Sequence, residues 1–122
     1  MHGEDLVSLG FMFGRQEWVC YISDISRMLP QTMTGITARC SESPCTLLVI
    51  DTLFFDEKQV SHFSLPEALE VVRPIRPIRT LLVGVSERLD HDEMNAQLSK
   101  LLTEENLDVQ VAYDGLCLDL LL

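Results

Sequence analysis

The spacing of hydrophobic and polar residues varies along the chain, and the first two apolar segments have the pattern of β-strands. Two apolar runs, Leu6–Phe13 and Glu17–Ser23, are separated by a turn-length break that contains Gly14. Strand-like runs joined by so short a break predict a β-hairpin. Two further runs, Cys45–Asp51 and Thr80–Ser86, are almost continuously apolar, which is typical of strands buried on both faces.

Three segments between or after these strands have the spacing of helices, and the signal is weakest for the first of them. A helix is expected over about Arg27–Thr37, with Asp24 or Ser26 as its N-cap. Pro30 and Gly35 weaken this helix, because neither residue favours a helix interior. The first helix is therefore expected to be short.

The other two helices have clear start signals. Ser64 and Glu67 have the spacing of a capping box, and the helix that they begin ends within Arg73–Arg79, which contains two prolines. Asp90 and Glu93 are suited to cap the third helix. Both helices carry an apolar stripe, which predicts that they pack on a sheet.

The last part of the chain has the pattern of a second hairpin. Within Asp108–Leu120, the pair Asp114 and Gly115 suits a tight two-residue turn. The resulting order, β-β-α-β-α-β-α-β-β, predicts one α/β domain over residues 1–122, with helices covering a sheet.

Composition and charge narrow the possible functions. The chain has 122 residues, of which 47% are hydrophobic, so it can build one buried core. No apolar run approaches the roughly 20 residues of a membrane-spanning helix, so no membrane partner is expected. The net charge of −10 argues against nucleic-acid binding, because phosphate contacts require a basic surface.

The cysteines indicate a reducing compartment. Cys20, Cys40, Cys45 and Cys117 show no CxxC spacing, and the N-terminus does not have the pattern of a secretory signal. Cys20 and Cys117 lie in apolar runs, where a free buried thiol is the ordinary interpretation. We therefore expect a cytoplasmic protein without disulfides.

Polar residues follow the ends of the predicted strands. Asp24 follows the second strand, Asp51 ends the third, and His62 lies in the loop after Asp51. A polar segment that includes His91 follows the strand Thr80–Ser86. Carboxylates and imidazoles that meet at one sheet edge are typical metal ligands.

Each of these residues also has a structural interpretation. Asp24 is an ordinary N-cap candidate, since Asp is favoured at that position. Asp51 is equally suited to anchor a loop, His62 to lie in solvent, and His91 to be a surface residue near a helix start. Spacing alone does not separate these alternatives.

Six segments together resemble a known family. Their order is similar to that of the C-terminal half of a metallo-β-lactamase-fold hydrolase, in the branch related to phosphoribosyl cyclic phosphodiesterase. The resemblance implies half of an αββα sandwich: a mixed sheet with helices on one face and a two-metal site at one edge. The segments are "MHGEDLVSLGFMFG", "VCYISDIS", "LLVIDTLF", "SHFSLPEALEVVRPIRP", "RTLLVGVSERLDHDEMN" and "LDVQVAYDGL".

The resemblance also implies roles for individual residues. His2 matches a histidine that ligates one metal, and Asp24 matches the carboxylate that bridges two metals about 3.5–4 Å apart. His62 matches a loop histidine near the substrate phosphate, where it would donate a hydrogen bond or a proton. Asp51 matches a carboxylate that would orient a ligand.

The chain departs from the family pattern in two places. The metal motif HxHxDH, which belongs to the family's N-terminal half, is missing. Gly84 stands where bacterial relatives have a histidine ligand. Other relatives have this histidine three residues later, where the present chain has Glu87. His91 or Glu87 itself is then the possible replacement for the last ligand.

The resulting hypothesis is a metal-dependent, phosphodiesterase-like hydrolase in a longer parent protein. The parent would bind two Zn2+ or Mn2+ ions and a small phosphoester, whereas this chain alone is expected to bind no ion stably and to be inactive. Because Met1 immediately precedes His2, we expect a truncated product, an isolated domain or a short isoform. The uncovered sheet face would pack on the missing N-terminal half or cause self-association.

Two alternatives remain. The first is a non-catalytic, truncated or degenerate half-domain with an interaction or regulatory role. The second is an unrelated α/β domain of the receiver or flavodoxin type, against which the terminal hairpins argue. An in-frame HxHxDH motif upstream would favour the hydrolase.

Overall fold

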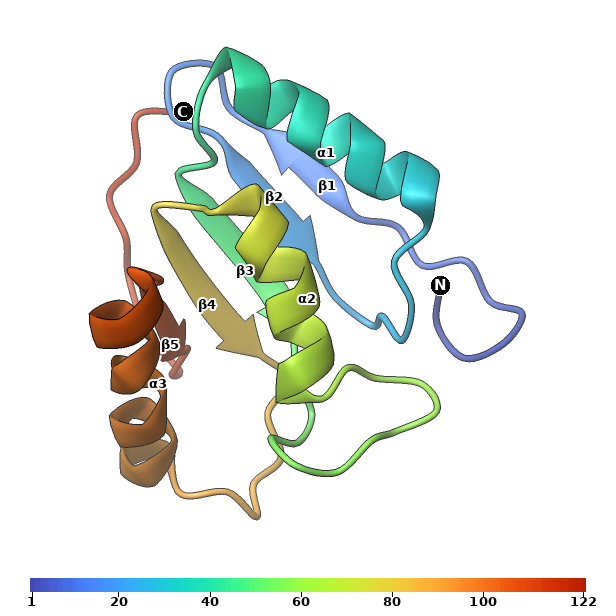
Figure 1. Cartoon of the computed structure of the whole chain (residues 1–122), viewed down its shortest axis with the longest axis vertical. Coiled ribbons are helices and arrows are strands. Elements are labelled where there is room, and N and C mark those ends of the chain that lie inside the picture. Colours follow the sequence, from blue (N-terminus) through green and yellow to red (C-terminus); the bar gives the residue numbers. More distant parts are fainter.

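The centre of the protein is a five-stranded mixed sheet. The computed structural model describes all 122 residues (Figure 1). The strands lie in the order β1-β2-β3-β4-β5; β1 is antiparallel to β2, and the other neighbours are parallel. The elements are β1 Phe11–Phe13, β2 Val19–Ile22, α1 Pro30–Glu42, β3 Leu47–Asp51, α2 Leu65–Ile75, β4 Arg79–Val83, α3 His91–Glu105 and β5 Val109–Val111.

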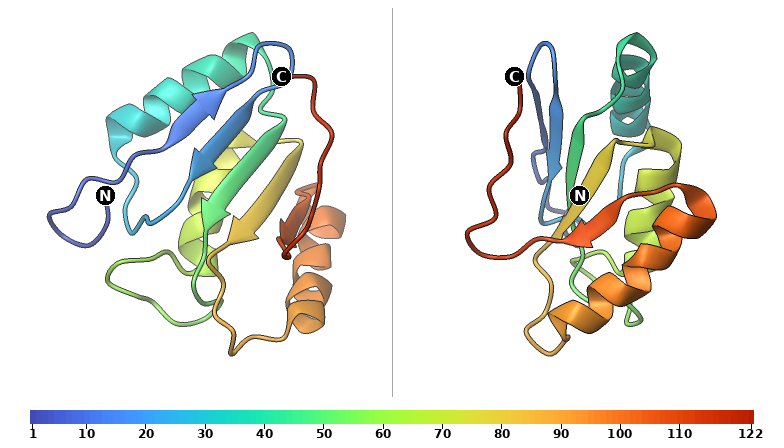
Figure 2. Two further views of the ribbon diagram at one scale, coloured as in Figure 1. Left: turned by 180° about the vertical axis from the view of Figure 1, so that it is seen from behind. Right: turned by 90° about the vertical axis from the view of Figure 1, so that its left-hand side faces the viewer.

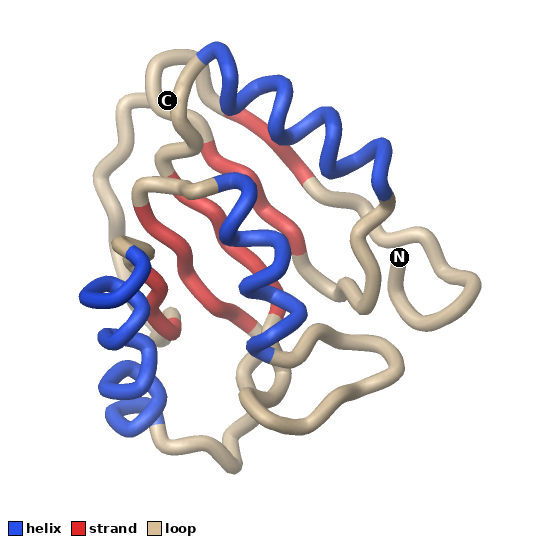
Figure 3. The backbone as a smooth tube through the Cα atoms, viewed as in Figure 1, coloured by secondary structure: helices blue, strands red, loops and turns tan.

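All three helices pack on one face of this sheet (Figures 2 and 3). Alternate side chains of each strand point toward them, as strand geometry requires. In β3, for example, Leu48 and Ile50 belong to the main core of 22 buried residues, whereas Leu47 and Val49 belong to a smaller cluster on the opposite face. The predicted fold class, a mixed sheet with helices on one face, is confirmed.

The hairpin predicted for Asp108–Leu120 is wrong. Only Val109–Val111 is a strand; the chain then turns at Gly115 and leaves the sheet (Figure 2). The last segment, residues 116–122, crosses the sheet face opposite the helices, and we call it the C-terminal strap. The predicted uncovered face is therefore partly covered by the chain's own end.

The C-terminal strap is held by apolar packing and by two hydrogen bonds at its end. Leu116, Leu118 and Leu120 pack against the smaller core cluster. The backbone N–H of Glu17 donates to Leu121 O (2.9 Å), and the backbone N–H of Leu121 donates to the Glu17 carboxylate (2.6 Å). The alternation of apolar and polar residues in the C-terminal strap thus follows from its packing on a sheet face.

The first helix starts and ends later than predicted. It begins at Pro30, the position where proline is favoured because its missing N–H has no helical partner. Neither Asp24 nor Ser26 is its cap; the N-cap residue is Leu29, which forms no side-chain capping bond. Gly35 is accommodated in the middle of the helix.

The other predicted helix starts are confirmed. The capping box of α2 is present, and the Glu67 carboxylate accepts hydrogen bonds from the backbone N–H and the hydroxyl of Ser64, both at 2.8 Å. At the start of α3, Asp90 accepts from the backbone N–H of Glu93 at 2.9 Å. None of the three helices combines the length and apolarity that crossing a bilayer requires.

The four cysteines are free, but they differ in burial. Cys20 and Cys45 are buried, Cys40 is half-buried, and Cys117 is exposed. The expectation of a buried Cys117 is therefore wrong, because the C-terminal strap turns this residue away from the sheet.

The strap makes a testable contribution to stability. Replacing half-buried Leu118 by Ala is expected to lower the free energy of unfolding by about 1–2 kcal/mol, because apolar contacts with the sheet are lost. Cys117→Ala, on the adjacent outward-facing position, is the matched control and should stay within about 0.5 kcal/mol. Urea unfolding measures both; equal effects would contradict the observed packing of the strap.

Candidate metal centre

Three predicted site residues from distant parts of the chain lie together beside the carboxyl end of the sheet. His2, Asp24 and His62 each offer one ligand atom, and these atoms lie within 4.8 Å of one another. The two imidazole rings meet edge to face, with centroids 5.1 Å apart and an interplanar angle of 74°. We call these three residues the His-Asp-His cluster.

Hydrogen bonds between the N-terminal loop and the segment after β2 position His2. The backbone N–H of His2 donates to Leu6 O (2.8 Å), which closes the loop. Met1 O accepts from the backbone N–H of Ser26 (2.8 Å), and the Met1 amine donates to Arg27 O (3.0 Å). His2 is thus joined to the segment that carries Asp24. Sequence reasoning considered Ser26 only as a cap and missed this role.

Asp24 lies just beyond β2 in an uncommon backbone conformation. Its φ of +53° is in the left-handed region, which Asp tolerates better than most residues. Its side chain is exposed and forms no hydrogen bond or ion pair, and α1 does not use it as a cap. The capping alternative for Asp24 is therefore excluded, and the carboxylate is available to a ligand.

His62 is oriented by Asp51. The two side chains form a hydrogen bond of 2.7 Å between His62 Nδ1 and Asp51 Oδ2. Asp51 is the last residue of β3, and its side chain is only 3% exposed. An imidazole that donates through Nδ1 keeps the lone pair of its other nitrogen for a metal or a proton. The loop-anchor interpretation of Asp51 therefore describes part of its role, since it holds the loop through His62, whereas His62 is only partly exposed to solvent.

The burial of Asp51 has an electrostatic consequence. Burial raises the pKa of the Asp51 carboxyl above 3.8, the hydrogen bond and charge of His62 partly offset this shift, and the Asp24 carboxylate adds to it. A buried carboxylate whose ionised form is disfavoured depends strongly on its hydrogen-bond partner. His62 and Asp51 therefore hold each other in position.

Gly84 makes room for this pair. It follows β4 with φ +68°, and a Cβ added to it would lie 2.5 Å from Asp51 Oδ1. A histidine at this position is incompatible with Asp51 as it lies. This close approach brings together residues at the ends of two neighbouring strands, which are far apart in sequence. The one signal in the sequence was a glycine directly after an apolar strand.

Glu87 and His91 are not part of the cluster. His91 is the first residue of α3; its Nδ1 lies 3.3 Å from the Asn95 side-chain nitrogen, and its ring lies 6.2 Å from that of Tyr113. Neither residue contributes a ligand atom to the His-Asp-His cluster.

The donor set of the cluster fits a divalent metal ion. Two imidazoles and one carboxylate are ligands that both Zn2+ and Mn2+ accept. His2 Nδ1 is also a buried polar atom without a hydrogen-bond partner, and buried polar atoms of this kind usually have a partner. Three side chains do not complete the coordination of two ions.

Zinc titration tests the cluster. In calorimetry, added Zn2+ should bind one-to-one and reversibly, so that dialysis removes it. Asp24→Asn should weaken this binding by about tenfold or more, because an anionic ligand becomes a neutral amide, and Asp51→Asn by about 10–100-fold, because His62 loses its orientation.

The matched control is His91→Ala, which removes the one histidine outside the cluster. It should leave the zinc affinity unchanged. A His91→Ala variant that loses zinc while Asp24→Asn keeps it would rule out the His-Asp-His cluster as the binding site.

No protein-family model matches the chain, and no curated protein has significant sequence similarity to it. Solved structures are similar in fold. A diphosphatase from the PhnP family aligns with 80% of this chain at 22% identity and a TM-score of 0.64, and the metallo-beta-lactamase fold protein YhfI from Bacillus subtilis with 83% at 17% identity and a TM-score of 0.61. A mutant of the CmlA beta-hydroxylase aligns with 85% at 11% identity and a TM-score of 0.55.

The matches cover most of this chain but only part of each neighbour. The aligned region spans 33%, 39% and 26% of the diphosphatase, of YhfI and of the CmlA mutant, respectively. One sheet with helices on one face is also one half of a two-sheet sandwich. This chain therefore has the metallo-β-lactamase fold, in the form of a partial, half-sandwich domain.

Proposed function

We propose that the chain is part of a metal-dependent, phosphodiesterase-like hydrolase of the metallo-β-lactamase superfamily, and that the rest of the active site lies on further protein. The observation that carries this proposal is the His-Asp-His cluster beside the carboxyl end of a sheet with this fold. The similarity to a structure described as a diphosphatase supports a phosphate-containing substrate, and we propose a phosphoester within that class.

In this proposal, His2 and Asp24 hold divalent metal, either Zn2+ or Mn2+. A metal ion bound there would activate a water molecule and polarise a phosphoryl oxygen. Asp24 has the chemistry for a shared ligand, because its two carboxylate oxygens have no other partner in the fold. Further ligands for a second ion would come from the N-terminal half, packed on the sheet face where the C-terminal strap lies.

His62 acts on the substrate in this proposal. Asp51 engages its Nδ1; when the other nitrogen has also taken up a proton, that nitrogen can donate a hydrogen bond or the proton to a phosphoester oxygen as charge develops. Removing the Asp51 carboxylate would release the ring and remove the acceptor that selects its tautomer.

We also propose a reducing compartment, the cytoplasm, as the place of action. The four cysteines are unpaired. Burial raises the pKa of Cys20 to about 11 and that of Cys45 to about 12, which keeps both as thiols at neutral pH.

The test uses a longer protein that includes the upstream reading frame. With Mn2+ or Zn2+, that protein should hydrolyse bis(4-nitrophenyl) phosphate, whereas the 122-residue chain should not. Asp24→Asn and His62→Ala should each lower kcat/KM by about 100-fold or more, because each removes a group used in the transition state. His91→Ala, outside the cluster, should remain within about twofold.

The alternative is a non-catalytic half-domain with an interaction role. It is favoured by the C-terminal strap, which already covers part of the sheet face that a second half would need. An upstream frame without HxHxDH, together with no turnover by any longer product, would support this alternative and contradict the hydrolase.

A further inference from the structure

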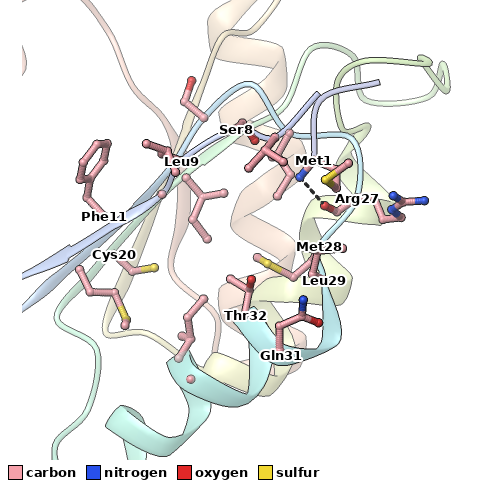
Figure 4. A pocket seen from close by; sticks show the side chains of 18 residues that line it. Met1, Ser8, Leu9, Phe11, Cys20, Arg27, Met28, Leu29, Gln31 and Thr32 are labelled. Carbon is pink, nitrogen blue, oxygen red and sulfur yellow. Dashed lines mark hydrogen bonds between the residues drawn. The ribbon is translucent and has the colours of Figure 1, made fainter. Parts of the chain in front are cut away.

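A cavity lies between the edge strand β1, its neighbour β2 and the first turns of α1, and some of its lining residues are next in sequence to residues of the candidate metal centre (Figure 4). Its volume is about 420 Å3, within the roughly 300–1,000 Å3 of ordinary small-molecule sites. Of its 18 lining residues, 11 are hydrophobic. The cavity is large enough for a ligand and apolar enough to favour one with a hydrocarbon group.

The cavity and the His-Asp-His cluster share two chain segments. Met1 lines the cavity and directly precedes His2, while Ser23 and Ile25 line it on either side of Asp24. Neighbouring Cα atoms are about 3.8 Å apart. The cavity and the cluster are therefore built on adjacent residues of the same two segments.

The cavity lining contains no acidic side chain, although the chain as a whole is strongly acidic. The net charge is −10, yet no Asp or Glu lines the cavity, and Arg27 is its one charged side chain. Gln31 and Thr32 add polar groups from the start of α1 (Figure 4). An anionic ligand therefore meets no carboxylate in this cavity.

Flexible side chains make the cavity adaptable. Met12 and Met28 line it, and methionine fits irregular apolar groups because its side chain is unbranched and polarisable. The lining also includes Gly35, where an added Cβ would meet no atom within 4 Å.

We propose that this cavity binds an apolar alkyl or aryl arm of the substrate, so that the substrate is a phosphoester with one hydrophobic substituent. This inference rests on the proposed function, because it uses the metal centre as the place of the phosphate. The apolar arm enters between β1 and α1, and the anionic head remains beside His2 and Asp24.

Gly35 allows the cavity to be filled without disturbing the fold. A Cβ added at Gly35 meets no atom within 4 Å. Because Gly35 lines the cavity, Leu at this position is expected to occupy part of its space, and Leu has a higher helix propensity than glycine. Gly35→Ala is the matched control, since it changes the helix propensity in the same direction but fills little of the space.

Calorimetry on the 122-residue chain tests the inference, with octyl phosphate and methyl phosphate as probes. Octyl phosphate should bind at least about 100-fold more tightly, because each buried methylene contributes about a factor of four, so that burying three or four of the seven extra methylenes is enough. Gly35→Leu should weaken octyl phosphate binding at least tenfold and leave methyl phosphate unchanged. Gly35→Ala should stay within about threefold of the original chain, and thermal unfolding verifies that both variants are folded.

Equal affinity for octyl and methyl phosphate would overturn the inference, as would a folded Gly35→Leu variant with unchanged octyl phosphate affinity. These outcomes leave hydrolysis by a longer protein unaffected. Conversely, tight octyl phosphate binding that Gly35→Leu removes, with no hydrolysis by the longer protein, would support the cavity as a site for apolar anions and contradict the proposed function.

Discussion

The hydrogen bond between His62 and Asp51 is the interaction on which the candidate site depends. It joins a long loop to the last residue of a central strand at 2.7 Å, and it gives a buried carboxylate its side-chain partner. Without His62, Asp51 would be a buried acceptor without a side-chain donor, which is costly. Without Asp51, the imidazole would lose its fixed direction toward His2 and Asp24. Gly84 permits the arrangement, because any side chain at its position would enter the space of the Asp51 carboxylate.

The two faces of the sheet have different roles in this account. The helical face forms the main core and fixes the ends of β2, β3 and β4, from which Asp24, Asp51 and Gly84 are presented. The opposite face forms a small cluster under the C-terminal strap. In a two-sheet sandwich, this second face is where the other half packs, so the strap and a second half would compete for the same apolar surface. In the proposed longer protein, the stability of the half-sandwich and its assembly with a second half would therefore be linked through this short segment.

Local interactions were predictable from the sequence, and distant ones were not. The capping box of Ser64 and Glu67 and the cap at Asp90 involve residues close in sequence, so their spacing identifies them. Pro30 weakens a helix when it lies in the interior, as the predicted bounds place it, but it favours a helix at the first position, where the structure has it. The leucines of the C-terminal strap have the alternating spacing of a strand. A period of two shows which side of a segment is buried but does not show whether a neighbouring strand is paired, so the same pattern predicted a hairpin. The prediction that His2, Asp24 and His62 lie together depended on the resemblance to a family, since no local pattern connects residues so far apart in sequence.

The most direct test of the central claim is a crystal structure of the 122-residue chain grown with Zn2+, using anomalous scattering to locate the ion. The account predicts a zinc peak bonded to the side chains of His2 and Asp24, with His62 beside it and its Nδ1 still on Asp51. An ordered zinc ion at His91 with none at the cluster, or a His62 ring turned away from Asp51, would contradict it.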